Sequence, residues 1–423
     1  MAERLKAPRG TFDILPGSAR RRDRVEQAAR ERFTRAGFGR IETPAFEETE
    51  VFARGVGGST DIVRKEMYSF ADKGGRELTL RPEGTAAVCR AFVEHGMSRQ
   101  ALPVKLWYVS AFFRHERPQA GRYRQFWQVG AEAIGSESPL VDAESIGLLH
   151  GLLDDLGVPG VRLRLGSLGS PATRAEYRAE LIAHLERHDA ELSTEVRERY
   201  RENPLRAFDS DDPATRAVME SAPRLLDRLS DADAEHFAAV RRLLDTAGIA
   251  YEVDPTLVRG LDYYTRTVFE FTCDSLGAQS GVGGGGRYDG LIAELGGPET
   301  PAIGWAAGIE RILLALGEED AESRRDVFVV CSPEQRERGF ELVDELRAAG
   351  LEADLDLADR AFKGQMKQAD RLGARVAVIL EAGRTRIRDM RSGEEREAEL
   401  GSVAAELETW AAPDGNPDTQ ATR

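Results

Sequence analysis

Cysteine is scarce in this chain of 423 residues, which contains only Cys89, Cys273 and Cys331. The three lie far apart, are odd in number and include no C-x-x-C pair, so they predict neither a disulfide framework nor a zinc site. We expect three reduced, partly buried thiols and no structural metal.

Long apolar runs are missing as well. No run reaches the roughly 18 to 20 residues that a membrane-spanning helix requires. The first residues, MAERLKAPRGTFDILPG, contain no apolar segment of the kind that secretory signals carry. We therefore expect a cytoplasmic protein without a membrane partner. With 41% hydrophobic and 31% charged residues, the composition is that of a globular protein and excludes a disordered one.

Basic residues are outnumbered by acidic ones, and the net charge of -15 argues mildly against nucleic acid as a partner. A basic cleft on an acidic body can still attract a polyanion, so the local distribution of charge has to decide.

The length of the chain predicts two or three domains. Apolar periodicity predicts helices near 18–37 and 143–156, and strands near 77–80, 105–113 and 126–134. The expected organisation is a mixed domain over residues 1–170 and 251–318, interrupted by a highly charged helical insertion over 171–250. A polar linker, 317–325, then leads to a small α/β domain over 326–410 with a mostly parallel sheet, and 411–423 form a disordered tail.

The segment FRHERPQAGRYRQFWQ, residues 113–128, lies between two expected strands and predicts a long hairpin with four arginines. Alternation places Phe126, Gln128 and Glu132 on one face of the returning strand. A bound polyphosphate would suit this face, with guanidinium groups for the phosphates and an aromatic ring for a base. A solvated basic hairpin is the alternative, and charge alone favours it.

Three further segments each allow two interpretations. Residues 257–270 form either an arm that reaches into a cleft or an ordinary loop. The glycine run in 281–290 predicts a turn, either packed beside a ligand or flexible, and without a βαβ unit it is no dinucleotide fingerprint. Residues 302–314 predict a helix that starts near Trp305 and runs to about Leu316, in which Arg311 requires Glu310, another acid or an anionic ligand as its partner.

Together these segments resemble the signature motifs of class II aminoacyl-tRNA synthetases. The first motif is similar to residues 37–44, the second to the Arg114 hairpin and the third to residues 304–311. Within that class, the segments RGLDYY (259–264), GGRYD (285–289), RPEGT (81–85) and RGTFD (9–13) resemble those of the histidyl-tRNA synthetase family. The resemblance covers nearly the whole chain.

The resemblance implies an α+β catalytic domain, with an antiparallel sheet flanked by helices, a helical insertion and a C-terminal α/β anticodon-binding domain. It implies ATP with Mg²⁺ as a substrate, L-histidine and tRNA(His) as partners, and a homodimer. The histidine carboxylate would attack the α-phosphorus, and a ribose hydroxyl of the tRNA would then attack the adenylate. Charge stabilisation and alignment would do most of the catalysis, without a protein nucleophile.

Site residues carried over by position form three overlapping groups. Arg114 and Arg259 would be catalytic, with Arg114 at the α-phosphate and Arg259 holding the substrate carboxylate and α-phosphate. The ATP-binding residues would be Arg114, Glu116, Phe126 and Arg311, with Phe126 and Arg311 on either side of the adenine. The histidine-binding residues would be Glu83, Thr85 and Gln128 at the ammonium group, Glu132 and Tyr264 at the imidazole nitrogens, Arg259 at the carboxylate, and Tyr263 and Tyr288 along the wall.

The alternative is a catalytically inactive synthetase relative that serves as regulatory subunit of the ATP phosphoribosyltransferase of histidine biosynthesis. Such relatives usually lack the anticodon-binding domain and lose motif arginines, whereas Arg114, Arg259 and Arg311 are present here. One segment departs from the family pattern. Residues 381–388 are shorter than the usual stretch before the last strand, so the sequence does not decide whether the last domain forms a hairpin there.

Overall fold

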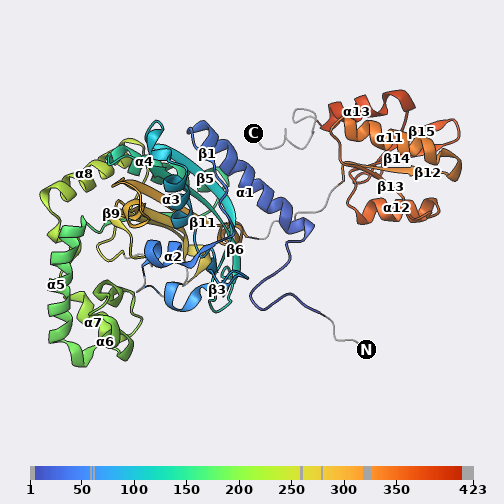
Figure 1. The fold of residues 1–423 in the computed structure, drawn as a ribbon. Helices are drawn as coiled ribbons and strands as arrows, with labels where there is room; N and C mark the ends of the chain where they lie inside the picture. Colours follow the sequence, from blue (N-terminus) through green and yellow to red (C-terminus); the bar gives the residue numbers. More distant parts are fainter. Residues whose placement is uncertain are drawn as a thin grey trace. The chain divides into compact units, whose positions relative to one another are not determined.

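The structure is a computed structural model that describes residues 5–57, 60, 62–257, 261–277, 280–317 and 325–411. It divides into two compact units, Met1–Leu15 with Ala19–Glu319, and Pro16–Ser18 with Asp320–Arg423 (Figure 1). No helix in these described ranges is both long and apolar enough to cross a membrane.

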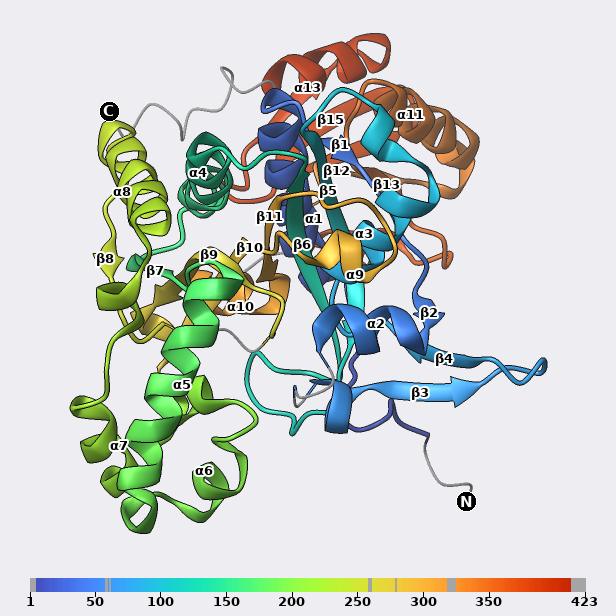
Figure 2. The same ribbon diagram turned by 60° about the vertical axis from the view of Figure 1, so that its left-hand side comes forward.

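An eight-stranded sheet forms the centre of the larger unit (Figures 1 and 2). The six inner strands are antiparallel, whereas both edge strands pair in parallel with their neighbours. In spatial order the strands are β1 (Gly39–Arg40), β5 (Val104–Phe113), β6 (Gln125–Ile134), β11 (Ala302–Gly308), β10 (Gly281–Arg287), β9 (Thr265–Cys273), β7 (Val161–Ser167) and β8 (Glu252–Val253).

Helices cover both faces of this sheet, because the side chains of each strand alternate between two apolar cores. Odd-numbered residues of β6, such as Val129 and Ala131, pack with α1 (Pro16–Arg35), α4 (Pro139–Asp155) and α8 (Asp231–Thr246). The opposite face packs with α3 (Thr85–Glu94) and the short α9 (Leu291–Glu294). Even-numbered residues of β6 therefore face α3.

Smaller elements complete the larger unit. A three-stranded antiparallel sheet lies beside α2 (Thr49–Val56), and a π-helix (Ile62–Glu66) follows α2 in the chain. Helix α10 (Ile309–Leu316) is the last helix of this unit among the described residues. In spatial order the strands of the small sheet are β2 (Phe46–Glu48), β4 (Glu77–Leu80) and β3 (Tyr68–Ala71).

Helices fill the chain between β7 and β8. This helical insertion contains α5 (Pro171–Arg187), α6 (Thr194–Arg199), α7 (Pro213–Glu220) and the returning helix α8. Ser170, Ser193, Asp212 and Ser230 cap these helices with side-chain oxygens that accept backbone N–H groups. In Figures 1 and 2, α5, α6 and α7 gather at one side of the sheet, and α8 returns the chain to α4.

The smaller unit is a five-stranded sheet with helices. Strands β13 (Ala353–Leu355), β12 (Val327–Cys331) and β14 (Val376–Glu381) are parallel, and β15 (Arg384–Asp389) and β16 (Glu395–Ala398) are added antiparallel. The helices are α11 (Arg336–Ala348), α12 (Phe362–Arg371) and α13 (Val403–Ala411). The sheet is therefore mixed rather than mostly parallel. The shortened 381–388 segment still forms the β14–β15 hairpin.

The glycine run was predicted as a turn, and this prediction is wrong. Residues 281–287 form strand β10 in the middle of the sheet. A Cβ on Gly285 would lie 2.0 Å from the carbonyl oxygen of Gly304, and one on Gly286 would lie 2.5 Å from that of Thr267. Glycine is required because the neighbouring strands approach so closely.

The helix predicted from Trp305 is wrong in its first half, where residues 302–308 form strand β11 and only Ile309 begins the helix. Small residues let this strand fit between β6 and the glycines of β10. The first predicted helix starts at Pro16 rather than at Ser18, since proline favours the first helical turn. The three cysteines are free and buried. Of the predicted linker (317–325) and tail (411–423), residues 318–324 and 412–423 lie outside the described residues.

Candidate active site

A cavity of about 580 Å³ lies on the α3-facing side of the large sheet, at the end of the β5–β6 hairpin. Residues from distant parts of the chain line it, including Phe126, Gln128 and the backbone of β10. Five guanidinium groups share the lining: Arg114, Arg122, Arg164, Arg206 and Arg311. Such a concentration of positive charge in an acidic protein suits a polyanion.

The β5–β6 hairpin fixes Arg114 at the floor of this cavity. Its Nε donates to the carbonyl oxygen of Pro82 at 2.9 Å. Its guanidinium carbon lies 5.3 Å from the centre of the Phe126 ring, within cation–π range. The prediction that Phe126 faces a ligand is compatible with this contact, because the ring also lines the cavity.

Arg311 enters the same cavity from the first turn of α10. Its Nε donates to the carbonyl oxygen of Gly281 on β10. Glu310 does not pair with Arg311, because it bonds Arg22 of α1 at 2.7 Å and accepts the backbone N–H of Trp127 at 3.1 Å. Burial lowers the pKa of Arg311, and the nearby Arg122 adds to this effect. An anionic ligand would relieve both costs.

Two carboxylates, Glu116 and Glu270, also line the cavity. Burial raises the pKa of Glu116, although Arg114 and Arg122 act to lower it. Glu116 lies 3.5 Å from Arg122. Among the described residues no group of three or more His, Cys, Asp or Glu side chains could hold a metal ion by itself.

Behind the cavity the sheet carries a buried polar cluster centred on Glu132 of β6. Its Oε1 accepts from the hydroxyl of Thr85 at 2.8 Å and from that of Tyr108 at 3.3 Å, and its Oε2 accepts from Tyr288 at 2.6 Å. The Glu132 side chain is 0% exposed, and burial raises its pKa to about 8. Burial thus favours the protonated form of this carboxyl, whereas the hydrogen bonds from Tyr288, Thr85 and Tyr108 act to lower its pKa.

Glu83 and Thr85 lie at the start of α3. The two carboxylate oxygens of Glu83 accept the backbone N–H groups of Thr85 and Ala86, each at 2.8 Å. Burial raises the pKa of Glu83 despite these bonds. The carboxyl of Glu83 thus caps helix α3 by accepting its first backbone N–H groups. Thr85, the first residue of α3, donates its hydroxyl to Glu132.

Tyr263, Tyr264 and Tyr288 form another side of this cluster. Tyr263 lies with its ring centre 4.6 Å from that of Tyr264 and 5.7 Å from that of Tyr288. Burial raises the pKa values of Tyr263 and Tyr288 well above the ordinary value, so both hydroxyls remain protonated donors. Gln128, between the cavity and Glu132 on β6, has a buried Oε1 that accepts no hydrogen bond from the described residues.

The structure thus gathers the predicted site residues into two adjoining groups. Arg114, Glu116, Phe126, Gln128 and Arg311 line the cavity. The second group surrounds Glu132 in the buried cluster: Glu83, Thr85, Tyr263, Tyr264 and Tyr288. Arg259, with residues 258–260, lies outside the described residues.

Sequence reasoning missed several members of the site. Tyr108 of β5 contacts Glu132, and it fits only because it lies opposite Gly130 on β6, where a Cβ would come within 2.4 Å of the Tyr108 ring. Arg206 of the insertion and Arg164 of β7 line the cavity. A tyrosine opposite a glycine is a recognisable signal, but only once the register is known.

The chain matches two family models, curated relatives and solved structures. A family model described as histidyl-tRNA synthetase matches residues 10–312, and one described as an anticodon binding domain matches residues 326–410. A histidine–tRNA ligase from Rubrobacter xylanophilus is 50% identical over 406 residues, 92% of this chain and 96% of that protein. One from Mycobacterium tuberculosis is 49% identical over 417 residues, 95% of this chain and 97% of that protein. The crystal structure of apo histidyl-tRNA synthetase from S. aureus matches with a TM-score of 0.80 and 37% identity, covering 96% of this chain and all of that one.

Proposed function

The chain belongs to the histidyl-tRNA synthetase family, and on this premise we propose that it ligates L-histidine to tRNA(His) through a histidyl-adenylate, with consumption of ATP. The class II architecture expected from the sequence is confirmed, with an antiparallel catalytic sheet and a C-terminal α/β domain. The regulatory-subunit alternative is not favoured, because relatives that match nearly the whole chain are histidine–tRNA ligases.

The observation that carries the proposed chemistry is the convergence of Arg114 and Arg311 on one cavity next to the Glu132 cluster. These residues come from the hairpin and from the helix that ends the unit, nearly 200 positions apart. A triphosphate in this cavity would meet charge-assisted donors on two sides.

We assign Arg114 to the α-phosphate and Arg311 to the adenine and γ-phosphate, with the Phe126 ring against the adenine. Glu116 belongs to the same ATP-binding group. Arg259 would hold the histidine carboxylate against the α-phosphorus. Because the attacking carboxylate is already a nucleophile, these residues act by alignment and by neutralising the charge that develops.

Mg²⁺ would enter with ATP. The donor set fits a hard cation of this kind, since Glu116 and Glu270 supply carboxylate oxygens at the cavity and phosphates supply the rest. When bound, the ion would neutralise charge on the phosphates.

The Glu132 cluster would receive the imidazole. A protonated carboxyl can donate one hydrogen bond and accept another, which suits a ring with one donor and one acceptor nitrogen. Tyr264 would address the second nitrogen, with Tyr263 and Tyr288 along the wall. Glu83, Thr85 and Gln128 would receive the ammonium group, for which Gln128 Oε1 offers a buried acceptor. Amino acids that lack these polar partners would be rejected by roughly 10⁴-fold or more.

The smaller unit would bind the anticodon of tRNA(His), because its family model describes that role. We also propose that the protein is a homodimer and acts in the cytoplasm.

Pyrophosphate exchange tests the proposed function directly. Purified protein with Mg²⁺, ATP and labelled pyrophosphate should form labelled ATP when histidine is added. Each of the other amino acids, added alone, serves as the control. Equal exchange with histidine and with those controls would refute the proposed reaction.

A further inference from the structure

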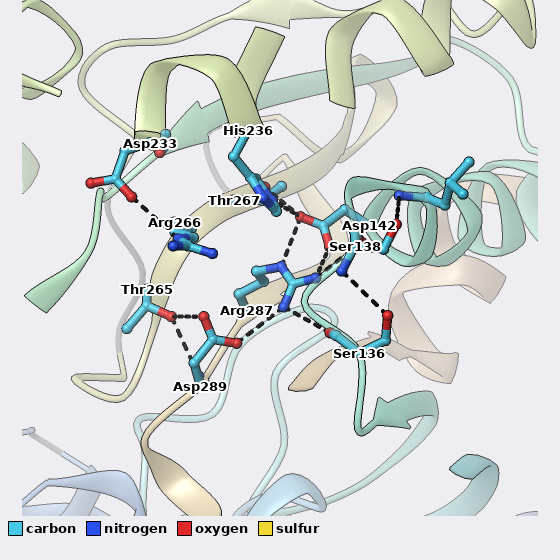
Figure 3. Close-up of polar contacts among 12 residues, drawn as sticks. Ser136, Ser138, Asp142, Asp233, His236, Thr265, Arg266, Thr267, Arg287 and Asp289 are labelled. Atoms are coloured by element: carbon cyan, nitrogen blue, oxygen red, sulfur yellow. Dashed lines mark hydrogen bonds and ion pairs between the residues drawn. The ribbon is translucent and has the colours of Figure 1, made fainter. Parts of the chain in front are cut away.

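A buried polar network joins β9 and β10 to α4 and α8, outside the residues assigned above (Figure 3). Its centre is Asp142 of α4, which is 0% exposed. Asp142 Oδ2 accepts from three donors on three elements: Thr267 Oγ1 at 2.7 Å, His236 Nε2 at 2.8 Å and Arg287 Nε at 3.0 Å. We call Asp142, His236, Thr265, Thr267, Arg287 and Asp289 the Asp142 network.

Arg287, at the end of β10, is also 0% exposed and is surrounded by acceptors. Its NH2 lies 2.8 Å from Asp142 Oδ1 and donates to the carbonyl oxygen of Ser138 at 3.1 Å. Its NH1 donates to Asp289 Oδ1 and to the carbonyl oxygen of Ser136, both at 3.1 Å. Burial acts to lower the pKa of Arg287, but Asp142 and Asp289 raise it, so the guanidinium stays charged.

Tyr288 lies between the two anchored residues of this network, Arg287 and Asp289. Asp289 accepts the backbone N–H of Ala302 at 3.2 Å, and its own N–H donates to Thr265 Oγ1 at 3.4 Å. Held on both sides, the Tyr288 hydroxyl reaches Glu132 at 2.6 Å. The position of the Tyr288 hydroxyl therefore depends on the charged side chains of Arg287 and Asp289, which are not among the residues assigned to the pocket.

A bulge in β9 directs three consecutive side chains to three different carboxylates. The pairing of β9 with β10 shifts between Gly286 and Arg287, and Arg266 adopts φ 46°, a left-handed conformation rare for arginine. Thr265 bonds Asp289, Arg266 bonds Asp233 at 3.2 Å, and Thr267 bonds Asp142. Strain of this kind persists only where surrounding contacts determine the backbone.

Helix α8, the returning helix of the insertion, carries two of these partners, Asp233 and His236. Being three residues apart, they lie on the same face of the helix, as Figure 3 shows. Burial acts to raise the pKa of Asp233, but hydrogen bonds from Ser170, Thr173 and Ser230 lower it to about 2. The insertion is thus joined to β9 through the carboxylate of Asp233 and to α4 through the imidazole of His236.

We propose that Asp142, Arg287 and His236 are positioning residues for histidine binding, which hold Tyr288 and Glu132 in place and couple helix α8 of the insertion to the pocket. This inference rests on the proposed assignment of Glu132 and Tyr288 to the histidine site. A displacement of α8 would act on histidine affinity through His236, because this side chain donates to Asp142.

The experiment measures KM for histidine and KM for ATP separately, by pyrophosphate exchange. Asp142→Asn keeps the shape of the side chain and removes its charge. It should raise the histidine KM at least tenfold and change the ATP KM less than twofold. His236→Leu should raise the histidine KM about threefold or more, whereas His236→Gln should restore it, because the glutamine amide can still donate to Asp142.

Controls separate positioning from loss of folding. Arg287→Lys should raise the histidine KM, whereas the same substitution at the Arg90–Glu47 pair, Arg90→Lys, should not. A merely structural network would lower the active fraction, measured by adenylate burst, and leave the histidine KM of the remaining enzyme unchanged. That result for Asp142→Asn and His236→Leu would overturn the proposal. Tyr288→Phe tests whether Tyr288 belongs to the histidine site, the assignment on which this proposal rests. An unchanged histidine KM in that variant would remove Tyr288 from the pocket, which is a different outcome from an unchanged KM in Asp142→Asn.

Discussion

Raising the pH should destabilise this protein through one buried carboxyl, that of Glu132. Burial raises its pKa from the ordinary 4.5 to about 8 in the folded protein. Between these values the unfolded chain has released the proton and the folded protein still keeps it, so each increase in pH favours the unfolded state. The stabilisation by the protonated carboxyl is complete below pH 4.5 and is lost as the pH rises to about 8.

The size of this effect follows from the two pKa values. Their difference, 8 − 4.5 = 3.5, corresponds to about 5 kcal/mol of unfolding free energy at about 1.36 kcal/mol per pKa unit. About 2 kcal/mol is lost by about pH 6, and a further ~3 kcal/mol is lost between about pH 6 and about pH 9.

The assay is denaturant unfolding of the wild-type protein and of Glu132→Gln at about pH 6 and about pH 9. Glutamine keeps the shape of the protonated carboxyl and does not titrate. The wild type should lose about 3 kcal/mol more than the variant between the two pH values. Glu137→Gln, at an exposed position, is the control and should behave as the wild type. Parallel pH dependence in wild type and Glu132→Gln would refute the reasoning.

Three further predictions concern single residues. Arg259→His should lower kcat at least about 10²-fold, the scale of losing one charge-stabilising donor; near-normal steady-state turnover would remove Arg259 from the mechanism. Gly304→Ala should raise the histidine KM roughly tenfold or more by displacing the carboxyl of Glu132, because the new Cβ would lie 1.6 Å from Glu132 Oε2; wild-type kinetics would contradict that geometry. Arg22→Met leaves the buried Glu310 without its ion pair and should cost about 3 to 5 kcal/mol in unfolding free energy; a cost under about 1 kcal/mol would show that the pair is not buried.

The local pattern of the sequence was sufficient for the long elements. Strands β5 and β6 and the arginine hairpin between them follow from alternation and from apolar runs, which act over a few residues. The high charge of residues 171–250 likewise predicted helices there. Local pattern failed at the glycine run and at the small residues from Ala302, because these segments become strands only when their neighbours approach closely.

The sequence by itself determined the family, because segments such as the Arg114 hairpin resemble the motifs of histidyl-tRNA synthetases over nearly the whole chain. Only the tertiary structure decided which side chains meet. Tyr108 lies opposite Gly130, and Asp142 bonds Arg287, the neighbour of Tyr288. Both pairs join distant positions whose relation depends on strand register and on the packing of α4 and α8. Register and packing are set by the whole core at once, so no short segment of the sequence contains them.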